Sequence, residues 1–217
     1  QTIVQQHAKE MGLQVSVVRP TQADAQDTLK DSAAIRPLVL TWRDQLAQAL
    51  KAHTDTAITW EEGPETPYFT DKPAWDCYTG LLLWAAYAEH PELVRPKHFE
   101  GDWTQDAAFA ASSAENFATR CPNLLRGVEL WLPCDIPFTF RFMEATGNEV
   151  VFGSSVALLH ELQDLNARTW QADGATLDRW CKEGAGREIS LETKARFAYS
   201  LFLRFAALST EHRLPMR

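Results

Sequence analysis

Residues 73–91 read PAWDCYTGLLLWAAYAEHP, and this stretch gives the clearest indication of structure in the sequence. Pro73 suits the first turn of a helix, where its missing N–H costs nothing. Apolar residues then recur at spacings of three and four, which places them on one helical face. They are Trp75, Tyr78, Leu82 and Ala86, widened by Leu81, Leu83 and Trp84. His90-Pro91 ends the pattern. It predicts a central helix.

Further helices are expected on both sides of this stretch. After Pro37 an apolar face forms from residues at helical spacing, namely Val39, Trp42, Leu46 and Leu50. Gly153-Ser154-Ser155 is typical of an N-cap that opens a helix to Trp170. Ser190 is expected to cap the last helix. Other helices are expected from about residue 24, over 104–120 and over 176–182.

Short runs with alternating or β-branched apolar residues indicate strands at 13–18, 57–60, 128–132, 138–142 and 149–152. The turn signal Thr146-Gly147-Asn148 favours a hairpin or meander for the later strands. The segments 61–72 and 92–103 are expected to be loops. The sequence therefore predicts an α+β fold in which several helices flank a small antiparallel sheet. We expect one domain over residues 1–217, with residues 1–20 as a peripheral segment.

Length and composition are those of a globular protein. The chain has 217 residues, 45% of them hydrophobic, which is enough to bury a core without disulfides or metal. No apolar run approaches the roughly 18–20 residues that span a bilayer. Residues 1–11 lack a signal-peptide pattern. Because the sequence starts at Gln1 rather than at a methionine, removal of a leader before this residue remains an open alternative. We expect a cytoplasmic protein.

The cysteines are spread along the chain without C-x-x-C spacing. This favours reduced, mostly buried thiols over a disulfide framework or a zinc site. The four are Cys77, Cys121, Cys134 and Cys181.

Negative charge is concentrated in one quarter of the chain. Residues 53–110 carry a net charge of −8, whereas residues 1–52 carry +1 and residues 111–217 carry −1. Such an excess repels nucleic acid and membrane phosphates and attracts a basic partner. A solvated surface that aids solubility explains the same charges.

Catalytic and metal-binding motifs are incomplete. His160-Glu161 lacks the second histidine of a zinc protease, because Asp164 stands four residues on. Gly153-Ser154-Ser155 lacks the second glycine of a nucleophile elbow, since Ala157 follows. Neither a phosphate-binding nor a dinucleotide-binding glycine motif occurs. We expect no enzyme activity, no cofactor and no metal.

The acidic loops contain the residues most open to a functional interpretation. Carboxylates between aromatic residues combine electrostatic steering with apolar anchors, as strong protein interfaces do. The candidate partner-binding residues are Glu61, Glu62, Glu65, Asp71, Asp76, Glu100, Asp102 and Asp106, with Tyr68, Phe69 and Trp103 as anchors. The same loops could instead line the sugar cleft of a small hydrolase that acts on a glycan through two carboxylates. In a third interpretation, Trp60 and Trp103 belong to the core and the acids are merely solvated.

Scattered apolar and turn residues across residues 38–205 resemble those of a known family. They are Trp60-Glu61-Glu62-Gly63, the run from Trp75 through Trp84 to His90-Pro91, Val128 to Pro133, Phe138, Gly147, Gly153-Ser154, Leu162, Leu165-Asn166 and Thr169-Trp170. In these positions the chain resembles bacterial immunity proteins of polymorphic and type VI-secreted toxins, in particular immunity protein family 52.

This resemblance implies an α+β antitoxin of the bacterial cytoplasm. Members are encoded beside toxins with a restriction-endonuclease-like domain, so the implied partner is a cognate basic nuclease, with no nucleic acid or membrane bound. The resemblance brings no catalytic residues and no contact residues with it. The concentration of negative charge agrees with a partner whose active site attracts DNA.

Overall fold

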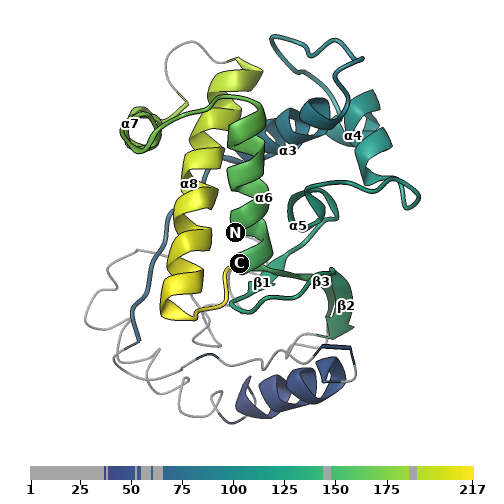
Figure 1. Cartoon of the computed structure of the whole chain (residues 1–217), viewed down its shortest axis with the longest axis vertical. Coiled ribbons are helices and arrows are strands. Elements are labelled where there is room, and N and C mark those ends of the chain that lie inside the picture. Colours follow the sequence, from purple (N-terminus) through teal and green to yellow (C-terminus); the bar gives the residue numbers. More distant parts are fainter. Residues whose placement is uncertain are drawn as a thin grey trace.

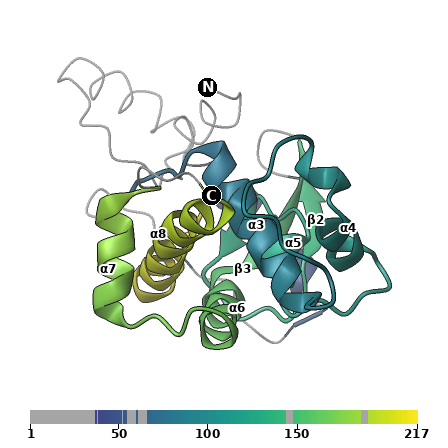
Figure 2. The same ribbon diagram turned by 90° about the horizontal axis from the view of Figure 1, so that it is seen from above.

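The helix expected from residues 73–91 forms and lies between other helices (Figures 1 and 2). The computed structural model describes residues 37, 39–51, 53–54, 60, 66–143, 148–185 and 190–217. Helix α3 (Trp75–Glu89) buries nearly all side chains from Cys77 to Ala86 and packs against helices on two sides. Trp75 departs from the prediction, because its side chain is 63% exposed on the first turn.

The C-terminal helices form the largest helical layer. Helix α8 (Leu191–His212) packs along both α3 and α6 (Ser155–Arg168), and α7 (Gly174–Glu183) packs against α8 (Figure 1). The predicted N-caps are confirmed. Ser154 accepts a hydrogen bond from the backbone N–H of Ala157, and Ser190 forms a reciprocal capping box with Thr193.

The single helix expected over 104–120 is wrong. A short 3-10 helix η1 (Trp103–Gln105) precedes helix α4 (Ala107–Ser113), which stops at Ala114. Asp106 separates η1 from α4, because its backbone is extended and its carboxylate caps the N-terminus of α4. The short helix α5 (Pro122–Leu125) follows and was not expected.

The sheet among the described residues has three strands, β1 (Leu130–Leu132), β2 (Phe140–Met143) and β3 (Glu149–Ser154), in the order β1-β3-β2. The predicted α+β class is confirmed, and β3 pairs antiparallel with β2 as the turn signal predicts. The pairing of β3 with β1 is parallel, so the sheet is mixed rather than wholly antiparallel. The burial of the last three residues of β3 agrees with its middle position in the sheet. Met216 pairs with Trp131 and covers the outer edge of β1.

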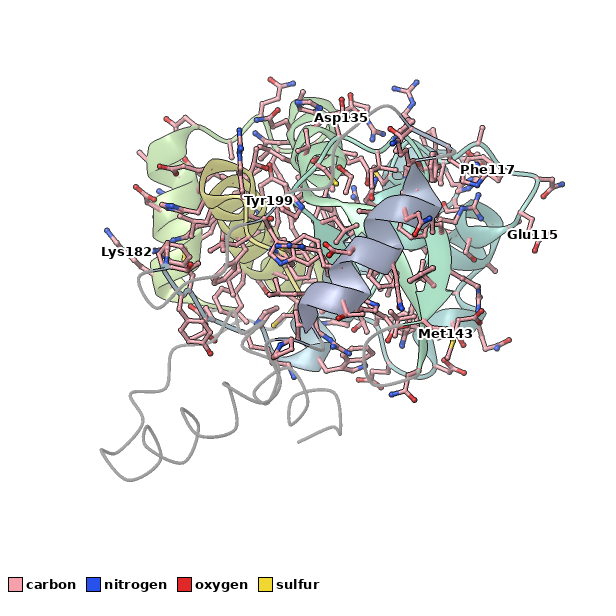
Figure 3. All side chains as sticks on the ribbon, turned by 90° about the horizontal axis from the view of Figure 1, so that it is seen from below. Glu115, Phe117, Asp135, Met143, Lys182 and Tyr199 are labelled. Carbon is pink, nitrogen blue, oxygen red and sulfur yellow. The ribbon has the colours of Figure 1, made fainter. Side chains whose placement is uncertain are left out.

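The sheet separates two parts of the core. On one face, Leu130 and Phe152 pack with Trp60 and with the helix over residues 39–50, whose predicted apolar face is buried. Figure 3 shows this helix in front of the strands. On the other face, Trp131 joins the core formed by α3, α6 and α8. The alternation of neighbouring strand residues between the two faces makes this division possible.

Several predicted elements lie outside the described residues. They are the strand at 13–18, the helix from about residue 24 and, apart from Trp60, the strand at 57–60. Over the part of the chain that the structure does describe, no helix combines the length and apolarity that crossing a membrane requires.

Candidate functional site

A groove of about 400 Å³ lies where the first half of α3, the loop over residues 98–103 and the first turn of α8 meet. Side chains that border it include Trp75, Asp76, His98, Glu100, Trp103 and Lys194. Three of these six, Asp76, Glu100 and Trp103, are residues that the sequence marked as candidate contacts. The groove therefore gathers part of the predicted site from segments that are separate in the sequence.

Close packing of α3 against α8 forms the floor of the groove. Gly80 makes this approach possible, because a Cβ atom there would lie 3.0 Å from Cβ of Lys194 and 3.3 Å from the backbone nitrogen of Ala195. The loop is tied to α8 by the backbone N–H of Leu191, which donates to the carbonyl of Lys97 at 2.8 Å. The walls are thus fixed by contacts between elements.

Asp76 and Lys194 form an ion pair across the two helices, with 2.9 Å between Oδ2 and Nζ. Hydrogen bonding and charge from Lys194 lower the pKa of Asp76 below its ordinary value. The carboxylate therefore stays ionised, and the two charges compensate one another inside the groove.

Trp75 and Trp103 give the groove an aromatic wall, with ring centroids 6.5 Å apart. Trp103 is held from behind by an edge-to-face contact with Phe109 at 4.6 Å. Trp75 contacts Tyr78 at 5.5 Å but remains 63% exposed. Trp103 is therefore anchored against the core, while Trp75 presents a large apolar surface to solvent.

The other predicted contacts that the structure describes do not line this groove. Tyr68 is 38% exposed, and Phe69 packs on the ring of His212 at 5.1 Å. Asp71 is exposed on the same irregular segment. Glu61, Glu62 and Glu65 lie outside the described residues.

Two of the predicted acidic contacts have local structural roles. Asp102 accepts hydrogen bonds from the backbone and side chain of Thr104 at the start of η1, and these bonds lower its pKa. Asp106 accepts from two backbone N–H groups at the start of α4 and from the hydroxyl of Tyr87 at 2.9 Å. Helix capping alone accounts for the acidic residue at both positions.

The motifs weighed as catalytic are used for structure. Ser154 and Ser155 are fully buried, and their hydroxyls donate to the carbonyls of Cys134 and Leu132. A substrate cannot reach either oxygen. His160 is exposed on α6, whereas the next residue, Glu161, turns into the core. Among the described side chains no three His, Cys, Asp or Glu residues are grouped closely enough to hold a metal ion.

Glu161 belongs to a buried polar network that joins α5, β3 and α6. Its Oε1 accepts from the backbone N–H and the side-chain amide of Asn123, at 3.1 and 2.6 Å. The amide oxygen of Asn123 accepts from the backbone N–H of Ser154 at 2.7 Å. Oε2 of Glu161 is buried without a partner. Burial raises the pKa of Glu161 to about 7, and the carboxylate of Glu89 adds to the rise.

The cysteines are free, and three of the four are buried, as the sequence predicts. Burial raises the pKa of Cys77 to about 11 and the pKa values of Cys121 and Cys134 to about 12. These three thiols are therefore neutral and poor nucleophiles at neutral pH.

Sequence reasoning missed three residues of the groove. Trp75 was assigned to the core face of α3, because helical periodicity does not reveal which turns of that face another element covers. Lys194 lies far from the acidic segment in sequence and carries no signal of its own. His98 lies in an expected loop, and nothing in its neighbourhood distinguishes it.

Comparison with known proteins adds no relative from which function could be transferred. Neither a protein family, nor a curated protein, nor a solved structure matches this chain. The resemblance to immunity proteins therefore stays a prediction.

Proposed function

We propose that this protein is an immunity protein, an antitoxin that binds and neutralises a cognate secreted nuclease in the bacterial cytoplasm. The observation that carries the proposal is the groove with its exposed Trp75 and Glu100, most of whose lining comes from the segment that holds the chain's excess negative charge. Tryptophan is enriched among the residues that dominate the energy of protein interfaces. The resemblance noted from the sequence points in the same direction.

Binding to a nuclease would combine long-range electrostatic attraction with close contact between apolar side chains. A nuclease must attract DNA, so its active-site surface is positively charged and draws a negative protein toward it. Exposed carboxylates such as Asp71 and Glu100 speed this encounter, whereas desolvated aromatic side chains slow dissociation. A stable complex of this kind buries about 1,200–2,000 Å² in total.

The alternative of glycan hydrolysis gains no support from the described carboxylates. A glycosidase needs one carboxylic acid whose pKa is raised, so that it can protonate the leaving group. Hydrogen bonds and the ion pair instead lower the pKa values of Asp76 and Asp102. Glu161 has a raised pKa, but its buried carboxyl is bound to Asn123 and does not border the groove.

The test is a capture experiment followed by an activity assay. The tagged protein is used to retain partners from a lysate of its native bacterium at low and at high salt, and retained proteins are identified by mass spectrometry. The retained partner is then separated in denaturant, refolded and assayed for DNA cleavage with and without the purified protein.

We expect one stoichiometric, basic partner whose DNA cleavage is suppressed at an equimolar ratio. Slower association at high salt is expected as well, because screening weakens the long-range attraction between exposed charges. A retained partner without nuclease activity, or a nuclease that stays active in the complex, would refute the proposed function.

A further inference from the structure

We propose that the groove between α3, the 98–103 loop and α8 receives an arginine side chain of the partner, stacked on Trp75 and paired with Glu100. This inference rests on the proposed function and names the chemistry by which the groove recognises the toxin. Its volume of about 400 Å³ falls within the range of small-ligand pockets, roughly 300–1,000 Å³.

The groove is better suited to a cation than to an anion, although the N-terminus of α8 borders it. Backbone donors at that end are already used: Leu191 donates to Lys97, Thr193 to the hydroxyl of Ser190 and Lys194 to the carbonyl of Ser190. The ammonium group of Lys194 is held by Asp76 at 2.9 Å. An incoming anion would therefore find few free donors, and it would meet the carboxylate of Glu100.

Glu100 supplies the uncompensated charge. It is exposed on the rim, and within the described part of the chain no cation pairs with it. The neighbouring pair of Asp76 and Lys194 is close to neutral as a unit. The charge left to attract a partner is therefore negative.

Trp75 favours arginine over lysine as the occupant. A guanidinium group is planar and weakly hydrated, so it can lie flat on an indole ring while its N–H groups bind a carboxylate. An ammonium group is strongly hydrated and loses more on entering an aromatic groove. The edge-to-face contact of Trp103 with Phe109 fixes the second wall, so the groove needs little reordering to accept a side chain.

The probe for this inference is an acetylated, amidated hexaarginine peptide, with hexalysine of equal charge as its control. Binding is followed through the indole N–H resonances in two-dimensional NMR spectra of the ¹⁵N-labelled protein. We expect hexaarginine to shift the resonances of Trp75 and Trp103 at lower concentration than hexalysine does. Equal effects of the two peptides, or shifts confined to other tryptophans, would overturn the inference.

Two variants test the residues directly, each with a matched control. Trp75→Ala and Glu100→Gln are each expected to weaken hexaarginine binding about fivefold, the effect of losing one cation–π or exposed charge contact. Met143→Ala removes another exposed apolar side chain, and Glu115→Gln another exposed carboxylate (both labelled in Figure 3), and neither residue lines the groove. The controls should bind as the parent does. Unchanged binding by both groove variants contradicts the proposal.

The captured nuclease separates the failure of this inference from the failure of the proposed function. Retention of the nuclease by Met143→Ala with loss by Trp75→Ala supports the groove as the contact. Unchanged retention by Trp75→Ala and Glu100→Gln overturns the groove and leaves the proposed function standing. If the parent retains no nuclease, the proposed function fails, while the peptide titration still decides whether the groove selects arginine.

Discussion

Replacing Glu161 by glutamine is expected to remove a pH dependence from the folding stability of this protein. The carboxyl is 8% exposed, and its Oε2 is buried without a hydrogen-bond partner. Ionisation therefore places a charge in the core that the two N–H groups of Asn123 and the backbone of Leu124 offset only in part. Glutamine keeps an oxygen for these donors but cannot ionise.

The magnitude follows from the shift in pKa. The pKa of Glu161 rises from 4.5 to about 7 in the folded state, because burial disfavours the charged form. The folded protein thus holds this proton more tightly than the unfolded chain does. The stability linked to the proton is fully present below pH 4.5 and is lost as the pH rises to about 7. At roughly 1.4 kcal/mol per pH unit, this loss is about 3 kcal/mol.

The assay is urea unfolding of the parent and the Glu161→Gln variant between pH 5 and pH 8, followed by tryptophan fluorescence. The parent should lose about 2.5 kcal/mol more than the variant over this range, because part of the loss has already occurred at pH 5. Only the difference in slope is diagnostic, since the new amide can change the absolute stability at every pH. Glu115→Gln, which removes an exposed carboxylate, should follow the parent. Parallel pH profiles for the parent and Glu161→Gln would refute the reasoning.

Three further changes test the core and the caps by thermal unfolding. Gly153→Ala should destabilise the fold by about 2–4 kcal/mol, because the new Cβ would overlap Oδ1 of Asn123, and an unchanged melting temperature would contradict this packing. Asp106→Ala should cost about 1 kcal/mol by removing the cap of α4, whereas Asp106→Asn should retain most of it. Trp60→Ala should cost about 3–5 kcal/mol, because this side chain is 3% exposed, while Trp75→Ala should cost less than about 1 kcal/mol. Equal losses for the two tryptophans would show that they are not divided between core and surface.

Local patterns in the sequence predicted much of the fold. The helix over 75–89, the final helix with its cap at Ser190 and the cap at Ser154 form where expected. These features depend on side chains within about four residues of one another, so spacing is enough to reveal them. The expected helix over 104–120 is interrupted at Asp106, which the sequence interpretation did not predict. Asp106 was considered for its charge, although its residue type also favours an N-cap.

Three of the six groove side chains, Trp75, Lys194 and His98, could not be identified from local sequence patterns. The sequence marked Asp76, Glu100 and Trp103, and the fold brings them to one groove. It marked Asp102 with equal weight, although that carboxylate caps η1. Composition and charge density cannot distinguish a carboxylate that binds a partner from one that caps a helix. The two differ only in which hydrogen-bond donor the carboxylate meets in the folded protein.

By itself, the sequence determined the α+β class, the positions of the main helices and strands, the burial of most cysteines and the concentration of negative charge. Only the tertiary structure decided that β3 lies between β1 and β2, that Glu161 is buried, that Trp75 is exposed and that Asp76 meets Lys194. Helical periodicity and capping arise from neighbours along the chain. Strand order, grooves and the environment of a buried acid arise from contacts between distant segments, which are established only when the core closes around them.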